Sequence, residues 1–281
     1  MYVIIINYNI NSIKNLWCFI GGEKMKEIFS MWKSTKMVVL VALTAAIYAA
    51  VLIPFKAIVL IPGVTEFRPA SAFPVVFGIL FGPAGAWGAA IGNLIGDFFG
   101  SLGLGSIFGF FGNFMFAYSS YIVWHYIGDN VPKLDGAFKY VKFLIAGLAG
   151  SLACALIIGY GLDLMGMVPF AALGTIVALN NFIPTAILGI PLLMILYPRI
   201  KKWNLLWTDI ISEEVPSVTV KSKLLATIFA VVVIIGFVIC LGAAVFSGQE
   251  MFQWGSASGN LNVKILGSIN VILMFGILGL L

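Results

Sequence analysis

The sequence is poor in charge. Of its 281 residues only 10% are Asp, Glu, Lys or Arg, whereas 61% are hydrophobic, and the mean hydropathy is +1.08. A soluble domain carries about 25% charged and about 45–50% apolar residues. Because charge is costly in hydrocarbon, this composition excludes a soluble globular protein and predicts an integral membrane protein that works in or across the lipid bilayer.

Residues and motifs of common enzyme classes are also missing. The chain has one histidine and contains no G-x-x-x-x-G-K-[ST], G-x-S-x-G or H-E-x-x-H sequence. The first absence argues against nucleotide hydrolysis by this chain, and the others argue against hydrolase or metalloenzyme chemistry. We therefore expect no catalytic residue, no metal site and no cofactor.

Cysteines are few, and they are not paired in the sequence. Cys18, Cys154 and Cys240 form no C-x-x-C motif, so we expect small packing residues rather than a disulfide framework or a zinc site. The net charge of +5 does not indicate nucleic acid, because the basic residues stand in short clusters between apolar runs.

Long apolar runs, in contrast, are abundant. A membrane-spanning helix needs about 20 mostly apolar residues. The runs predict an all-α integral membrane fold, with a six-helix bundle followed by two additional C-terminal helices. The expected helices cover residues 37–54, 69–82, 84–100, 105–127, 141–165, 169–198, 224–246 and 264–281. Between the second and third, Gly82-Pro83 predicts a turn or a kink.

These helices divide the chain into four regions. We expect a cytoplasmic or interfacial segment at 1–36, a substrate-binding membrane domain at 37–198, a cytoplasmic linker at 199–223 and a two-helix tail at 224–281. The first residues are compatible with an interfacial helix and with an unused upstream start before Met25. No internal repeat relates the halves, so the inverted repeats of many secondary transporters are not visible.

Basic residues are distributed unevenly around these helices. With the amino end inside, 13 of the 16 Lys and Arg residues fall in cytoplasmic segments, and only Lys56, Arg68 and Lys264 fall outside. Cytoplasmic loops of membrane proteins are enriched in positive charge. We therefore expect a multi-pass cell-membrane protein with both termini in the cytoplasm.

The loop after the first helix is the most unusual outer segment. Three prolines and a glycine exclude a plain helix between Pro54 and Pro69 and predict an ordered or gating loop. Near its end stand Glu66 and Arg68. Two interpretations are open: the pair stands at the mouth of a site, or the two are solvated loop charges that pair weakly.

The expected helix at 84–100 carries two stripes at four-residue spacing. The first consists of glycines, which is typical of close helix packing, and the second continues from Ala89 to Asn93 and Asp97. An ionisable residue inside a membrane is a functional candidate by default. We therefore treat Asn93 and Asp97 as candidate binding residues, with helix packing as the alternative.

Amide side chains lie in two further apolar runs. Asn113 stands among phenylalanines, and Asn180 and Asn181 are adjacent. Hydrogen bonds between helices would explain them, and so would a bound polar molecule. An aromatic-lined cavity with a few amides and one or two charges would suit a small, partly aromatic solute. The candidate substrate-binding residues are thus Glu66, Arg68, Asn93, Asp97, Asn113, Asn180 and Asn181.

The first helix carries a surface of small residues. Ala42, Ala46 and Ala50 share one face, with Ala45 and Ala49 beside them. Such a small-xxx-small pattern permits close contact with another helix, in the same chain or in a partner.

The order of these features resembles the substrate-binding S components of energy-coupling factor (ECF) transporters, which are prokaryotic vitamin importers. The resemblance covers about residues 30–200. It rests on the alanine-rich first helix, the loop ending at Arg68-Pro69, the Phe81-Gly82-Pro83 turn and the sequence G-N-x-x-G-D at 92–97. It implies an outward-opening site formed by the loop after the first helix and the outer parts of the fourth to sixth helices.

The resemblance also implies partners. The A-x-x-x-A face of the first helix would dock onto a transmembrane coupling subunit driven by two ATPase subunits. The tail departs from the family pattern, whose members usually stop after six helices, and two extra helices could obstruct or modify docking.

Our interpretation is an S component in the prokaryotic plasma membrane that binds a vitamin-like small-molecule solute from outside and delivers it inward. Two alternatives are a stand-alone secondary transporter with Asp97 as its ion-coupled group, and a structural membrane protein whose polar residues only hold helices together.

Overall fold

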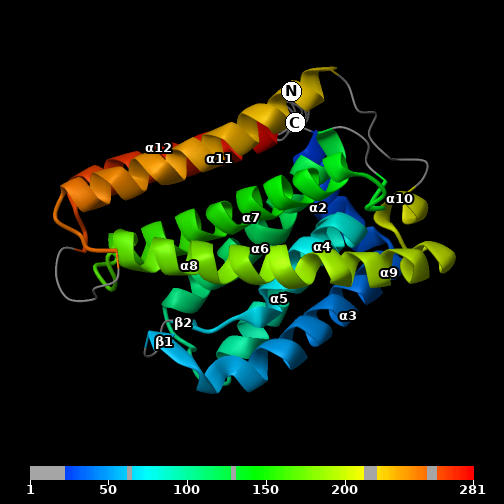
Figure 1. Ribbon diagram of the computed structural model, residues 1–281, viewed down its shortest axis with the longest axis horizontal. Coiled ribbons are helices and arrows are strands. Elements are labelled where there is room, and N and C mark those ends of the chain that lie inside the picture. Colours follow the sequence, from blue (N-terminus) through cyan, green and yellow to red (C-terminus); the bar gives the residue numbers. More distant parts are fainter. Residues whose placement is uncertain (1–22, 62–64, 128–130, 212–219, 252–257) are drawn as a thin grey trace, which may run out of the picture.

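The computed structural model describes residues 23–61, 65–127, 131–211, 220–251 and 258–281. All eight expected helices are present, so the prediction of an all-α membrane fold is confirmed (Figure 1). They are α3 (Thr35–Leu52), α4 (Ala72–Phe81), α5 (Pro83–Asp97), α6 (Gly105–Tyr126), α7 (Ala137–Leu164), α8 (Phe170–Pro184) continued by α9 (Ile190–Lys202), α11 (Val220–Phe246) and α12 (Leu261–Leu280). In the described residues six helical segments are long and apolar enough to span a membrane, and α4 and α5 are shorter.

Short elements fill the connections. They are α2 (Glu23–Ser30), the 3-10 turns η1 (Met31–Lys33), η2 (Ile53–Ala57) and η3 (Pro69–Ser71), the strands β1 (Val59–Ile61) and β2 (Thr65–Glu66), and α10 (Trp207–Ile210). In the described part of the proline-rich outer loop, β1 and β2 form an antiparallel hairpin in which Val59 pairs with Glu66, and residues 62–64 lie outside the described residues. Cys18 lies outside the described residues, whereas Cys154 and Cys240 are buried free thiols.

The expected single helix at 169–198 is interrupted. After Pro184 the chain forms a π-helical turn, Thr185–Gly189, before α9 begins with Pro191 in its first turn. A proline cannot donate the hydrogen bond that continues an α-helix, and its ring crowds the preceding turn. Helix α9 then extends beyond the apolar run to Lys202, because Lys and Arg are good helix formers and suit a helix C-terminus.

The connection between α4 and α5 is a tight turn. Gly82 has a φ of +56°, a conformation that glycine adopts without the steric cost of a Cβ atom, and Pro83 begins α5. The indole of Trp207, from α10, lies directly over Gly82. This turn makes α4 and α5 a helical hairpin whose second arm returns toward the β1–β2 end of the bundle.

The glycine stripe of α5 packs against α3. A Cβ atom at Gly88 would clash with the Thr44 hydroxyl, and one at Gly92 would lie 2.8 Å from the carbonyl oxygen of Ala45. Both glycines therefore allow the two backbones to approach closely. With this face of α5 occupied, the adjoining stripe that carries Asn93 and Asp97 is left to face α6 and the interior.

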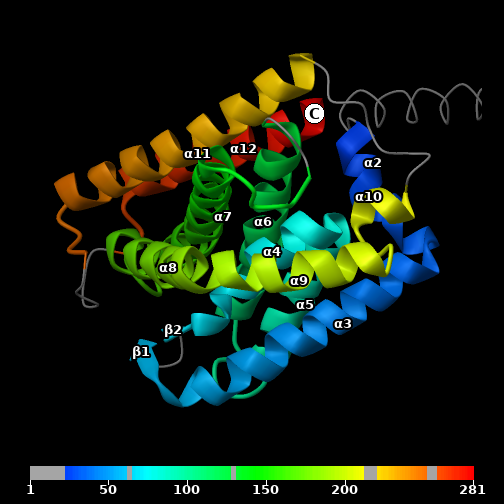
Figure 2. The same cartoon turned by 45° about the vertical axis from the view of Figure 1, so that its right-hand side comes forward.

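The tail helices α11 and α12 lie on the side of the bundle opposite α3, in both views (Figures 1 and 2). They pack on each other and on α7. In the described residues the tail therefore leaves the outer face of α3 uncovered.

One buried carboxylate fastens the tail to the bundle. Asp163, at the end of α7, accepts hydrogen bonds from the backbone nitrogen of Phe170 (2.7 Å), from Gln249 Nε2 (2.6 Å) and from the backbone nitrogen of Gly259 (2.8 Å). Gln249 also accepts from the backbone nitrogen of Ala171. Asp163 of α7 and Gln249, which lies between α11 and α12, thus cap the N-terminus of α8, where backbone N–H groups lack helical partners.

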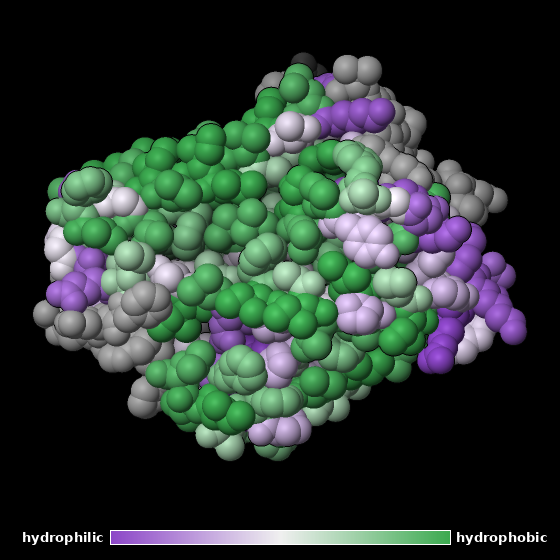
Figure 3. Space-filling view, in the orientation of Figure 1, coloured by the Kyte–Doolittle hydropathy of each residue, from purple (hydrophilic) through white to green (hydrophobic). Residues whose placement is uncertain are grey.

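The surface has the distribution that a bilayer requires. Hydrophobic side chains cover the middle of the molecule, and hydrophilic ones gather at one end over α9 and α10 (Figure 3). A smaller hydrophilic group lies between α8 and the β1–β2 hairpin, surrounded by hydrophobic side chains.

Candidate functional site

The hairpin carries Glu66 and Arg68 into the interior. Glu66 lies on β2, and Arg68 follows with a φ of −123° and a ψ of 66°, outside the helical region that Pro69 disfavours in the residue before it. Both side chains are buried, with residue exposures of 3% and 7%. The interpretation as solvated loop charges is therefore excluded by the structure.

Asn180 of α8 holds this segment from the other side. Its Oδ1 accepts from the backbone nitrogen of Arg68 at 3.0 Å, and its Nδ2 donates to the backbone oxygen of Glu66 at 2.6 Å. The amide thus makes the two backbone hydrogen bonds that a neighbouring strand would make, and it holds the hairpin against α8. Asn180 therefore contacts the backbone of Glu66 and Arg68 rather than their charged groups.

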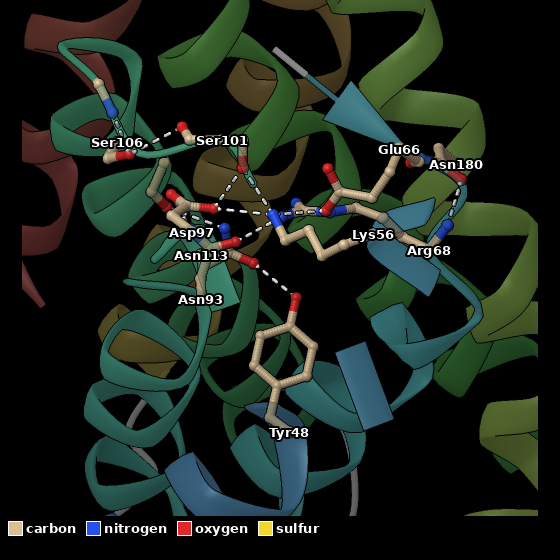
Figure 4. A network of polar contacts seen from close by, with 12 residues as sticks. Tyr48, Lys56, Glu66, Arg68, Asn93, Asp97, Ser101, Ser106, Asn113 and Asn180 are labelled. Carbon is tan, nitrogen blue, oxygen red and sulfur yellow. Dashed lines mark hydrogen bonds and ion pairs between the residues drawn. The ribbon is translucent and has the colours of Figure 1, made fainter. Parts of the chain in front are cut away.

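Lys56 occupies the centre of the charged cluster (Figure 4). Its Nζ lies 2.9 Å from Glu66 Oε1 and 3.1 Å from Asp97 Oδ1, and it donates to Ser101 Oγ at 2.6 Å. The side chain is only 6% exposed, although it comes from η2 at the edge of the bundle. An ammonium group has three N–H donors, and here each has an oxygen partner.

Arg68 completes the network. Its Nε donates to Glu66 Oε1 at 3.1 Å, and its Nη2 donates to Asn93 Oδ1 at 2.5 Å. Asn93 Nδ2 in turn donates to Asp97 Oδ2 at 3.2 Å. Two cations and two carboxylates therefore balance, which is how buried charges are tolerated.

The pKa of Glu66 shows which effect prevails. Burial raises the pKa of this carboxyl, but the positive charges and hydrogen bonds of Arg68 and Lys56 outweigh burial and hold it below its ordinary value. The pKa of Arg68 is raised, because burial, which lowers it, is outweighed by surrounding negative groups. Both groups are therefore ionised at neutral pH.

The remaining predicted residues lie around this cluster. Asn113 of α6 accepts from Tyr48 at 3.0 Å and donates to the backbone oxygen of Gly109 at 2.8 Å. A Cβ atom at Gly109 would lie 3.0 Å from Asn93 Nδ2, so α6 approaches the cluster closely at this glycine. Asn181 accepts from Ser71 Oγ at 3.0 Å and thus joins α8 to η3.

A small cavity adjoins the cluster. It measures about 70 Å³ and has a polar wall that includes Arg68, Asn93, Asp97 and Ser101. The opposite wall is aliphatic, and it consists mainly of Ile158, Leu162, Leu173 and Val177. Ligand sites in proteins measure about 300–1,000 Å³, and this cavity is smaller than that range.

A larger hollow lies on the other side of the hairpin. It measures about 380 Å³ and runs between Leu60 and Phe67 of the hairpin and α8, lined almost entirely by apolar side chains. It contains no charged group that could orient a polar solute. We therefore assign the candidate site to the smaller cavity, where the charges converge.

Two features of the site differ from the sequence-based expectation. The cavity wall is aliphatic rather than aromatic, because Phe114 of α6 packs on Trp87 and Phe108 packs over Gly161 instead. Lys56 and Ser101 were not among the predicted site residues. The sequence marked Lys56 as one of the two basic residues in the outer loop, and it marked Ser101 as the next position of the four-residue spacing that includes Asn93 and Asp97.

The predicted docking alanines separate into two groups. Ala42, Ala46 and Ala50 are exposed along α3, whereas Ala45 and Ala49 are buried, with α5 against Ala45. In this conformation a partner helix could reach only the first group. Among the described residues, no group of three or more His, Cys, Asp or Glu side chains could hold a metal ion.

Comparison with known protein families gives a match. The family described as QueT transporter matches residues 38–198, which is more than half of the chain and ends before α11 and α12. No curated protein and no solved structure matches. The matched region holds the hairpin, the charged cluster and the exposed alanines, so the chain belongs to the QueT transporter family and is a substrate-binding S component of the ECF type.

Proposed function

We propose that the chain captures a queuosine precursor from outside the cell at the cluster around Glu66, Arg68 and Asp97, and delivers it inward together with a coupling subunit and two ATPase subunits. The family is that of S components for queuosine precursors. The observation that carries the proposal is a buried polar cluster with balanced charges, which lies between a cavity and the β1–β2 hairpin.

The chemistry of the cluster suits such a solute. Queuosine is a modified guanosine, so its precursors have a flat base with hydrogen-bond donors and acceptors around its edge. At the cavity wall Asn93 offers an amide, and Asp97 offers a carboxylate. The aliphatic wall formed by residues such as Leu173 would cover one face of the base.

The hairpin is the element that would open. It is joined to α3 through η2 and is held to α8 mainly by the amide of Asn180. A few hydrogen bonds and ion pairs at one edge are the kind of contact that local opening breaks at modest cost. Lifting the hairpin would expose Arg68 and the cavity to the outside.

The exposed alanine face of α3 supports the partner part of the proposal. Ala42, Ala46 and Ala50 form a continuous small-residue surface that neither the tail nor another described helix covers. Without a nucleotide-binding motif of its own, the chain needs an external source of energy. Co-expression with candidate partners should therefore yield a complex containing two ATPase subunits, and a monomer that transports in vesicles without ATPases would contradict this.

Binding to the purified protein tests the site directly. Titration of detergent-purified protein with 7-deazaguanine bases should show saturable binding, and Arg68→Ala should weaken it. Lys133→Ala, in an exposed loop away from the cluster, is the matched control. Equal affinity of the parent and Arg68→Ala would show that Arg68 does not contact the solute.

We also propose that both termini lie in the cytoplasm. Thirteen of the 16 basic residues support this orientation, and α2 and α12 contact each other, which supports an even number of crossings between them. Reporter fusions after residue 210 and at the carboxy terminus should both report a cytoplasmic location. An external signal from either fusion would overturn the orientation.

A further inference from the structure

The position of Lys56 defines a site for an ammonium group. We propose that Glu66, Asp97 and Ser101 form a primary-ammonium subsite, which Lys56 fills when no solute is bound and which an amine of the solute takes over during binding. This inference rests on the proposed function, and it adds a cationic amine to the expected chemistry of the solute.

The geometry around Nζ is that of a complete ammonium site. Three oxygens of three different side chains lie at 2.6–3.1 Å from Nζ, and two of them belong to carboxylates. Lysine carries a compact ammonium with three rotatable donors, so any primary ammonium can make the same contacts. The subsite is thus specific for the group and not for the lysine that carries it.

The cavity reaches the subsite from the opposite direction. Asp97 and Ser101 line the cavity, whereas Lys56 does not. A solute in the cavity would therefore meet two of the three ammonium partners directly. Its amine would approach the oxygens from the interior, while the lysine approaches from η2.

Lys56 has a route by which to leave. Its backbone lies at the edge of the bundle next to exposed Ala57 and Ile58. Its stem passes over Gly96 and Gly100, since a Cβ atom at either would lie 3.7–4.0 Å from it. The flexible four-carbon side chain allows the ammonium group to rotate toward water while the backbone of η2 stays in place.

Exchange also keeps the buried charge in balance. Lys56 and Arg68 now neutralise Glu66 and Asp97. If a solute ammonium replaces Lys56, two cations still face two carboxylates. A neutral solute that displaced Lys56 would leave one carboxylate buried without a cation, which is strongly unfavourable. The cluster therefore favours a cationic solute over a neutral one of the same shape.

The first test needs no knowledge of the solute. Lys56→Ala in the solute-free, detergent-purified protein should lower the melting temperature, and propylammonium chloride should restore it in part. Tetramethylammonium chloride at the same concentration has the charge but no N–H donor, and it should not. The parent protein controls for general salt effects. Equal responses of Lys56→Ala to the two salts would overturn the subsite.

The second test compares two 7-deazaguanine bases, one with an aminomethyl group at C7 and one with a methyl group. The amine should bind about tenfold or more tightly to the parent protein, a factor that corresponds to about 1.4 kcal/mol. Lys56→Met, which keeps the stem but removes the competing charge, should widen this preference, and Asp97→Asn should remove it.

The outcomes of the second test separate three possibilities. If Lys56→Met weakens binding of the amine, Lys56 stays in place and contacts the solute, and the exchange is wrong. Equal binding of both bases to the parent also overturns it. If neither base binds, the proposed solute is wrong, and the response to propylammonium alone decides on the subsite.

Discussion

Two buried aspartates show how the six-helix region and the tail differ. Asp97 shares its oxygens with a lysine, an asparagine and a serine beside a cavity. Asp163 accepts from two backbone nitrogens and one glutamine, and it lines neither the small polar cavity nor the apolar hollow. Exchangeable side-chain partners next to free space suit binding, whereas backbone donors suit a structural role.

The exposed faces of the two regions differ in the same way. The outer face of α3 exposes three alanines together with Val39 and Leu43, while the outer faces of α11 and α12 present mainly large side chains such as Ile235, Val238 and Ile272. Small residues permit close helix contact, and large branched ones are normal against lipid. This difference supports the proposal that the first region docks a partner, whereas the second contacts lipid.

The largest expected effect concerns docking. Ala46→Trp should leave solute binding intact but abolish uptake in cells that contain the coupling subunit and ATPases, because a bulky side chain would hold a partner helix away from α3. Val238→Trp, on the exposed face of the tail, is the matched control and should transport normally. Unchanged uptake by Ala46→Trp would exclude this face as the docking surface.

The next effect concerns binding. Asp97→Asn keeps the shape but removes the charge, so a polar group of the solute would lose a charge-assisted hydrogen bond. That loss costs about 2–4 kcal/mol, or roughly 30- to 1000-fold in affinity. Titration of the purified variant measures it. Affinity within about threefold of the parent, or about 0.7 kcal/mol, would make Asp97 a packing residue like Asp163.

Asp163→Ala should show the opposite pattern. Three buried donors would lose their acceptor, at about 1–3 kcal/mol each, so the melting temperature should fall while solute affinity stays within about threefold, or about 0.7 kcal/mol. Asp163→Asn keeps one acceptor oxygen, so its melting temperature should lie between those of Asp163→Ala and the parent. If Asp163→Ala weakened binding as strongly as Asp97→Asn, the proposed division between the two aspartates would fail.

The smallest effect concerns acid stability. Because the pKa of Glu66 is lowered in the folded protein from its ordinary value of 4.5, the unfolded chain takes up the proton first. Its contribution to stability is thus complete above pH 4.5 and is lost as the pH falls through the lowered value. Melting temperatures of the parent should drop more steeply in this range than those of Glu66→Gln. Parallel curves would show that the pairs with Lys56 and Arg68 contribute nothing.

The helices could be predicted because their signal is local. Eight apolar runs gave eight helices within a few residues, and Gly82-Pro83 marked the turn between α4 and α5. The break after Pro184 was visible as a proline, but its form as a π-helical turn depends on the packing around Thr185 and Gly189. The hydrophobicity of an apolar run determines whether it forms a membrane helix, whereas the packing of neighbouring helices determines local backbone features such as the π-helical turn.

The candidate site was predictable in its members but not in its connections. Polar residues in apolar runs stand out, so Glu66, Arg68, Asn93 and Asp97 could be selected before any fold was known. Lys56 was harder to assign, since a lysine at the end of a membrane helix usually extends to the interface. Its inward direction follows from the oxygens of Glu66, Asp97 and Ser101 that its ammonium group contacts.

The amino-acid sequence alone establishes the membrane class, the helix order and the set of polar residues near the outer ends, because each depends on hydrophobicity and spacing along one segment. Only the tertiary structure decides which alanines stay exposed, which carboxylate borders the cavity and which group occupies the ammonium subsite. These depend on which faces of distant helices meet, as α3 meets α5 and Gln249 meets α8. Short-range patterns do not contain that information.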